Sequence, residues 1–173
     1  MASIIEFIKK GNLGPLKLGC KKEYIRGLLG EPEQTSESAK WNCIIWKYGS
    51  LEIHFKINTA IGIEYLNSIT IEYWYDHEFK FPSALNLEGW IPDHETTMEE
   101  FLNHSSSSGI LLAQDKDLSF IDDAFYLISE IGVSIIFSKD IDTEQPFLSK
   151  ISYSKELYNS EKIQRVFNEK KIE

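Results

Sequence analysis

The sequence predicts an α+β protein built from two tandem units of short helices packed on an antiparallel β-sheet, followed by a C-terminal helix. Three observations predict this class. Apolar residues recur at helical spacing at the start of each half, they alternate with polar residues in the segments that follow, and the alternating segments of the two halves share a constant offset. We expect the units to span residues 1–85 and 86–173, or to form one continuous domain. With 173 residues, 42% of them hydrophobic, the chain is long enough to bury a core.

Two short helices are expected to open the chain. The segment 4–8 has apolar residues at helical spacing and runs into two lysines, whose charges favour a helix C-terminus. A second helix is predicted near residues 24–29, because Gly30 supplies a C-cap and Pro32 prevents continuation. The apolar face of this second helix would carry Tyr24, Ile25, Leu28 and Leu29.

Strands are predicted after a polar stretch, residues 33–40, which lacks apolar periodicity and reads as a surface loop. Apolar residues at 51, 53 and 55 alternate with polar ones, and Tyr48-Gly49-Ser50 has the turn chemistry to join this strand to Cys43–Lys47 in a hairpin. A third strand, residues 68–75, places Thr70, Glu72 and Trp74 on the face opposite Ile69 and Ile71. We therefore expect one face of the sheet to be covered by helices and the other to face water.

The second half repeats this order. Val133, Ile135 and Phe137 follow Leu51, Ile53 and Phe55 by 82 residues, and Ser152 follows Thr70 by the same interval. A helix capped by Thr96 or Thr97 would match the second helix at an offset of 77, with the serines at 105–108 in a loop. A C-terminal helix is expected near residues 155–170. We interpret the pattern as a tandem duplication; the alternative is the chance similarity of two α+β segments.

Charge excludes one class of partner. The chain has 18 basic and 27 acidic residues, a net charge of -9, which disfavours binding to nucleic acid because that affinity comes mainly from neutralising phosphates. Most of this charge lies in the second half, with a net of -1 over residues 1–90 and -8 over residues 91–173. The acidic half is either a solvated surface or a patch that steers a basic partner. The candidate patch residues are Asp115, Asp117, Asp122 and Asp123.

Enzyme and metal chemistry find little support in the sequence. No phosphate-binding glycine loop, dinucleotide fingerprint, zinc-protease or nucleophile-elbow motif is present, and the aspartates lack calcium-loop spacing. The two cysteines form no metal or redox motif. We expect no catalytic residue, no metal site and no cofactor. Among the histidines, we expect only His54, on the open sheet face, to act as a contact residue for a partner.

Apolar anchors are needed for tight protein binding, since aromatic residues dominate the centres of interfaces. Trp74, Tyr75 and Trp90 are the candidates, with Glu72 and His54 as polar neighbours. The alternative is that these aromatic residues close the edge of the core.

A family resemblance adds to this interpretation. The segment Leu18–Pro32, with a glycine, an aliphatic helix and the ending Leu-Gly-Glu-Pro, resembles the signature of the SmpA/OmlA lipoprotein family. The duplicated layout is similar to the β-lactamase inhibitory protein family, whose two units form a concave sheet that grips another protein. The small acidic chain also resembles bacterial immunity proteins. The resemblance implies a protein-binding scaffold.

The expected function is therefore stoichiometric inhibition of another protein. We expect an immunity protein that neutralises a bacterial toxin, for example a nuclease, by occluding its basic active site. The alternative is an intracellular small-molecule-binding or assembly module that uses the open sheet face. Since the N-terminus lacks a signal-peptide pattern and no apolar run reaches the roughly 20 residues of a membrane span, we expect a cytoplasmic location without membrane contact. The sequence leaves the oligomeric state open.

Overall fold

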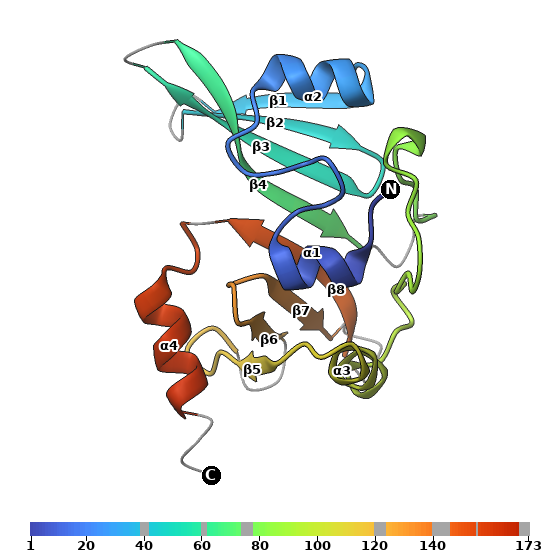
Figure 1. Cartoon of the computed structure of the whole chain (residues 1–173), viewed down its shortest axis with the longest axis vertical. Helices are drawn as coiled ribbons and strands as arrows, with labels where there is room; N and C mark the ends of the chain where they lie inside the picture. The colour runs from blue at the N-terminus through green and yellow to red at the C-terminus, as the bar shows by residue number, and fades with distance from the viewer. Residues whose placement is uncertain are drawn as a thin grey trace.

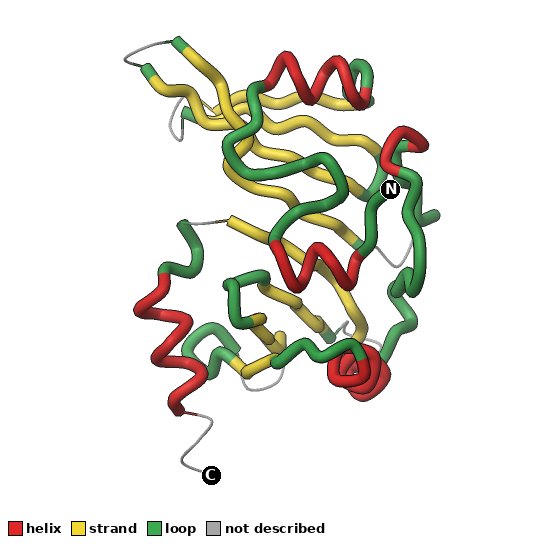
Figure 2. Tube along the Cα trace, viewed as in Figure 1, coloured by secondary structure: helices red, strands yellow, loops and turns green. Residues whose placement is uncertain are grey.

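The fold, seen in a computed structural model, is an α+β arrangement whose described residues form one eight-stranded antiparallel sheet and four α-helices (Figures 1 and 2). The structure describes residues 1–38, 42–59, 62–73, 78–119, 124–139, 146–154 and 156–169. Within these ranges, no helix has the length and apolar character to cross a membrane.

In each half, helices precede the strands, and α4 follows the last strand. The first half contains α1 (Ile4–Lys10), α2 (Lys22–Leu29), β1 (Gln34–Ser38), β2 (Cys43–Tyr48), β3 (Leu51–Asn58) and β4 (Ile63–Glu72). The second contains the 3-10 helix η1 (Ser83–Leu85), α3 (Met98–Ser107), β5 (Leu112–Gln114), β6 (Ala124–Ser129), β7 (Ser134–Ser138), β8 (Phe147–Ser154) and α4 (Ser160–Glu169).

The sheet has the strand order β1-β2-β3-β4-β8-β7-β6-β5, and every neighbouring pair is antiparallel. Each half therefore contributes a four-stranded meander, and the last strands of the two meanders pair at the centre (Figure 1). The central register pairs Thr70 with Ser152. Both halves belong to one sheet, and their apolar residues form one main core.

Apolar residues line one face of the sheet from β2 to β6, because cross-strand partners point to the same side. A single row of partners on this face runs through Tyr48, Leu51, Ile71, Ile151, Ile135 and Leu127, all buried. The adjacent row on the other face runs through Gln34, Lys47, Glu52, Thr70, Ser152, Ser134, Ile128 and Ala113. The alternation predicted for β3 is thus confirmed. In β4, which begins at Ile63, the polar side chains of Ser68, Thr70 and Glu72 lie opposite the apolar ones as predicted, but they are buried and do not face water.

Three of the described α-helices cover the apolar face. Ile4, Phe7 and Ile8 of α1, Ile25 of α2 and Phe101 of α3 are buried in the same core as the sheet residues. The predicted limits of α1 and the predicted end of α2 before Gly30 are confirmed, whereas α2 begins earlier than predicted, at Lys22. Gly11 ends α1 in a left-handed conformation with φ 70°. A side chain at Gly11 would overlap the ring of Tyr153, so the close approach of α1 to β8 requires glycine.

The fourth helix, α4, lies against the opposite face at the β5–β6 end of the sheet. Tyr158 and Val166 form a second small cluster there with Ala113 and Ile128. The prediction of a C-terminal helix that packs back on the body is confirmed, with α4 beginning at Ser160.

Three local predictions are wrong. The expected loop at 33–40 contains β1, a strand whose polar side chains are nearly all exposed; backbone pairing with β2 holds it, so it needs no apolar alternation. The expected loop at 105–108 is instead the last turn of α3, where Ser105 is buried. Tyr24, placed on the apolar face of α2, is 50% exposed because only Ile25 of that helix is fully buried.

Irregularities in the two meanders follow the offset of 82 residues. The register between β3 and β4 shifts at His54/Phe55, and that between β7 and β8 shifts at Ile136/Phe137. The register shifts are therefore separated by the same 82 residues as the alternating strands themselves.

Candidate functional site

The candidate site is the surface of β2, β3, β4 and β8 on the side away from α1, α2 and α3, which we call the helix-free face. Within the described part of the chain, no helix packs on these four strands from this side, since α4 lies over β5 and β6. The face is mostly polar, with Ile45 and Cys43 among its side chains on β2. Its polar side chains include Lys47, Glu52, His54, Lys56, Ser68, Thr70, Glu72, Lys150, Ser152 and Ser154.

Glu72 is the last residue of β4; it lies on the helix-free face and is only 5% exposed. Its carboxylate accepts a hydrogen bond from Lys47 Nζ at 2.8 Å, and Lys150 Nζ lies 3.6 Å from its other oxygen. A carboxylate this buried is stable only when ion pairs and hydrogen bonds replace its water. Lys150 on the neighbouring strand β8 and Lys47 on β2, which lies beyond β3, supply them.

A second row of interacting side chains on the helix-free face consists of Glu52, His54 and Cys43. His54 Nε2 donates to Glu52 Oε1 at 2.6 Å, and Cys43 Sγ lies 4.0 Å from His54 Nδ1. The hydrogen bond from His54 lowers the pKa of Glu52, while burial raises the pKa of the Cys43 thiol. A raised pKa opposes formation of the thiolate that a nucleophilic cysteine needs.

The charges of the helix-free face balance one another. Besides the pairs at Glu72 and Glu52, Lys56 pairs with Glu156 just beyond β8. Paired charges in a rigid sheet suit recognition by a partner surface with complementary polar groups. The face differs from the acidic surface that the sequence suggested, because lysines accompany its carboxylates.

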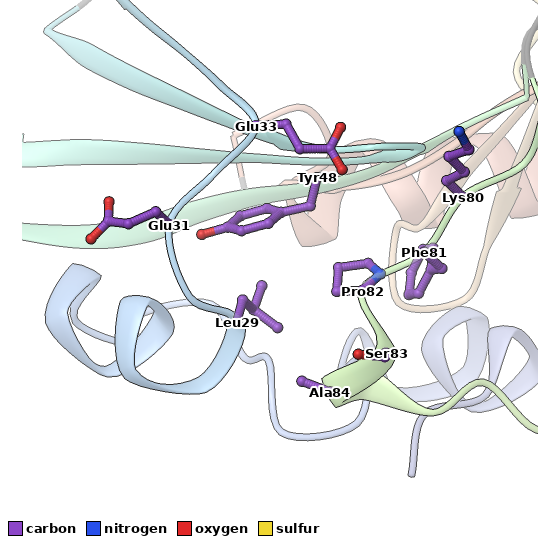
Figure 3. A pocket seen from close by; sticks show the side chains of 9 residues that line it. All are labelled: Leu29, Glu31, Glu33, Tyr48, Lys80, Phe81, Pro82, Ser83 and Ala84. Atoms are coloured by element: carbon purple, nitrogen blue, oxygen red, sulfur yellow. The ribbon is translucent and has the colours of Figure 1, made fainter.

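A side-chain-sized pocket of about 230 Å³ lies at the β2–β3 turn end of the sheet (Figure 3). Its walls come from the end of α2, from Tyr48 at the end of β2 and from the segment 80–84. A neighbouring pocket of about 280 Å³ shares Glu33 and Lys80 with it and extends to Lys47 on the helix-free face. The lining residues of the first pocket are Leu29, Glu31, Glu33, Tyr48, Lys80, Phe81, Pro82, Ser83 and Ala84.

The prediction that Asp115 belongs to an exposed acidic patch is wrong, because this residue is fully buried. Its carboxylate accepts hydrogen bonds from the backbone N–H groups of Asp117 and Leu118 and from the Tyr158 hydroxyl, and Lys162 Nζ lies 3.4 Å away. Burial and the Asp115 carboxylate both raise the pKa of Tyr158. Asp115 therefore anchors α4 to the end of β5 and presents no charge to a partner.

The remaining predicted contact residues that the structure describes lie in three separate places. Glu72 and His54 lie on the helix-free face, whereas exposed Asp117 pairs with Arg165 of α4. Trp90 lies on the helix-covered side, where its half-buried ring stacks on His104 at 4.3 Å and meets Phe101 edge-on at 5.3 Å between ring centroids. Trp74, Tyr75, Asp122 and Asp123 lie outside the described residues.

Lys47 and Lys150, the partners of Glu72, are missing from the sequence prediction. The position of Lys47 could have been predicted from the sequence, because alternation along β2 and the tight Gly49-Ser50 turn place Lys47 beside Glu52. Lys150 carried no such signal, since β8 reaches β4 only through long-range pairing. The described residues hold no cluster of three or more histidine, cysteine or acidic side chains arranged for a metal ion.

Comparisons with protein-family models, curated proteins and solved structures find no significant match to this chain.

Proposed function

We propose that this chain is a protein-binding inhibitor that docks its partner on the helix-free face. The observation that carries the proposal is a rigid, ion-paired sheet surface at the centre of the molecule, which the described helices leave uncovered. Sheet strands hold such polar groups in fixed positions, which lowers the entropic cost of binding. The partner would lie across β2, β3, β4 and β8.

The partner that fits best is a basic protein. The net charge of -9 attracts a positively charged surface over long range and raises its association rate, while contacts at the face hold it. A toxin with a basic active-site cleft has this chemistry, and the resemblance to immunity proteins supports that choice. Inhibition would result from occlusion of the cleft in a bacterial cytoplasm.

A tandem origin of the two halves belongs to the same proposal. The offset of 82 residues in the strands, the matching bulges at His54/Phe55 and Ile136/Phe137, and the mirrored strand order all support it. Two similar units side by side would extend one surface across the central β4–β8 pair.

The test is capture of a partner from the native host, followed by an assay of that partner's activity. We expect wild-type protein to recover a basic protein and to block its activity at an equimolar ratio. Ser154→Arg on β8 and Ser36→Arg on β1 add bulk and positive charge to the cross-strand row that contains His54, which crosses the helix-free face and continues onto the adjoining strand β1. Both variants should lose capture and inhibition. Ser106→Arg makes the same change on an exposed position of α3 and should behave as wild type.

The proposal is wrong if no captured protein is inhibited, or if the Ser36 and Ser154 variants bind and inhibit as wild type does. The alternative of a small-molecule or assembly module makes a different prediction. Binding of an apolar ligand changes little with salt, whereas steering of a basic protein weakens as salt screens the charges. The two pockets at the β2–β3 turn end of the sheet, at about 230 and 280 Å³, are smaller than most ligand sites and closer to the size of one side chain.

A further inference from the structure

We propose that the pocket between Tyr48 and the segment 80–84 is the receptor for one arginine side chain of the protein partner. This inference rests on the proposed function, since it names the chemistry of a contact that the partner would make. The pocket lies at one end of the sheet, next to the helix-free face.

The shape of the pocket suits a long side chain with an apolar stem. Leu29 and the Tyr48 ring form one wall, and Phe81, Pro82 and Ala84 form the other (Figure 3). A volume of about 230 Å³ accommodates a single large side chain. Aromatic and proline rings pack well against both the methylene stem and the flat guanidinium of arginine.

The charges at the rim favour a cation. Glu31 and Glu33 border the pocket, and Lys80 is the one cationic residue among its nine described lining residues. The ammonium of Lys80 lies 3.5 Å from Glu78, which offsets its charge. Glu31 pairs with Arg26 at 3.1 Å, but both side chains are largely exposed, so this pair is weak and open to exchange for a better-shielded guanidinium.

Local contacts hold the pocket in shape before any ligand arrives. The Tyr48 hydroxyl donates to the Gly30 carbonyl at 3.0 Å, and the N–H of Gly49 donates to Glu33 Oε2 at 3.2 Å. The Ser50 N–H donates to the Lys80 carbonyl at 2.7 Å, which joins the segment 80–84 to the β2–β3 turn. Gly49 has φ 57°, and a Cβ there would lie 2.6 Å from that carbonyl, so this close approach requires glycine.

The pocket is also continuous with the proposed docking face. The neighbouring pocket shares Glu33 and Lys80 with it and is lined further by Lys47, the partner of Glu72. A partner lying on the helix-free face could therefore extend one basic side chain around the turn at Gly49-Ser50 and into the pocket.

The test uses N-acetyl-arginine amide as the probe and backbone NMR shifts of the full chain as the readout. We expect the probe to shift the signals of Leu29, Tyr48 and Phe81 with a dissociation constant on the order of 1–10 mM, as befits a single side chain. N-acetyl-citrulline amide, which has nearly the same shape without the charge, should shift them far less. Equal responses to the two probes, or no response to either, would overturn the inference.

Variants of the rim sharpen the test. Glu31→Gln and Glu33→Gln should each weaken binding of the arginine probe by about threefold or more, whereas Lys80→Ala should strengthen it, because electrostatic attraction to the rim changes in opposite directions. Glu37→Gln, on exposed β1 outside the pocket, is the matched control and should leave affinity unchanged. Unchanged affinity in both glutamate variants contradicts the inference. Glutamine keeps the acceptor that the Gly49 N–H uses, and thermal melts check folding.

The outcomes separate this inference from the proposed function. If a captured partner needs Ser36 and Ser154 but is indifferent to Glu31→Gln and Glu33→Gln, the pocket proposal fails and the docking proposal stands. If the arginine probe binds selectively but no partner is inhibited, the pocket proposal stands as a binding site and the inhibitor function fails.

Discussion

The hydroxyl oxygens of Thr70 and Ser152 lie 2.9 Å apart across the central β4–β8 pair, although 82 residues separate them in the chain. The two residues occupy the position where the meanders of the two halves meet, in the middle of the helix-free face. Thr70 is 5% exposed, so its hydroxyl depends on that of Ser152 in place of water. This contact therefore joins the two halves of the sheet and lies on the proposed docking surface, so a loss of the contact would affect both the stability of the protein and the shape of that surface.

A double-mutant cycle at this pair should give a coupling free energy of unfolding of about 0.5–1.5 kcal/mol, the usual worth of a hydrogen bond. Thr70→Val keeps the shape of the side chain, and Ser152→Ala removes the other hydroxyl. Urea denaturation of the two single variants and the double variant measures the coupling. Additive effects of the two substitutions would show that the hydroxyls do not depend on each other.

Glu72→Gln should lower the free energy of unfolding by about 1–3 kcal/mol, because Lys47 and Lys150 lose a buried counter-charge. The control is Glu6→Gln, which removes an exposed i,i+4 pair with Lys10 and should cost less than about 0.5 kcal/mol. Chemical denaturation of both variants checks the difference. Equal costs would mean that the Glu72 ion pairs contribute no more than a surface pair.

Asp115→Asn should destabilise the fold by about 1–3 kcal/mol, since its amide nitrogen would oppose the Tyr158 hydroxyl and its lost charge would leave Lys162 unpaired. Asp117→Asn, only two residues away but exposed, should cost less than about 0.5 kcal/mol. Thermal denaturation distinguishes the two. Comparable stability of both variants would refute the anchoring role of Asp115, and any binding defect of an Asp115 variant needs this stability control.

Tyr48 should titrate with a pKa of about 12, raised by burial and by the negative charge of Glu31. Because the folded-state pKa lies above the unfolded value of 10.0, the contribution of Tyr48 to stability is present below pH 10 and is lost as the pH rises through 12. Ultraviolet difference titration of wild type against Tyr48→Phe isolates this group. A difference spectrum centred near pH 10 would show that the Tyr48 phenol is not shielded.

Local signals predicted the elements with strong patterns. The limits of α1 at Gly11 and of α2 at Gly30 followed from capping residues, and the β2–β3 hairpin followed from alternation on both sides of Gly49-Ser50. β1 escaped prediction because nearly all its side chains are exposed, so nothing in their polarity marks the strand.

The candidate site was harder to predict than the fold. His54 and Glu72 were placed on the open face from the parity of their strands, which is a local property. Asp115 was misjudged because a charged residue near the end of a strand looks exposed in sequence, and only the packing of α4 shows that Tyr158 and Lys162 surround it.

The sequence by itself determined which residues alternate, where the helices stop and which side of each strand is apolar, because these depend on neighbours along the chain. Only the tertiary structure decided that β4 pairs with β8, that Glu72 receives lysines from β2 and β8, and that Asp115 is buried beneath α4. The reason is that burial and ion pairing depend on segments that are distant in the chain. These contacts contribute free energy only after β4 and β8 have paired at the centre of the sheet.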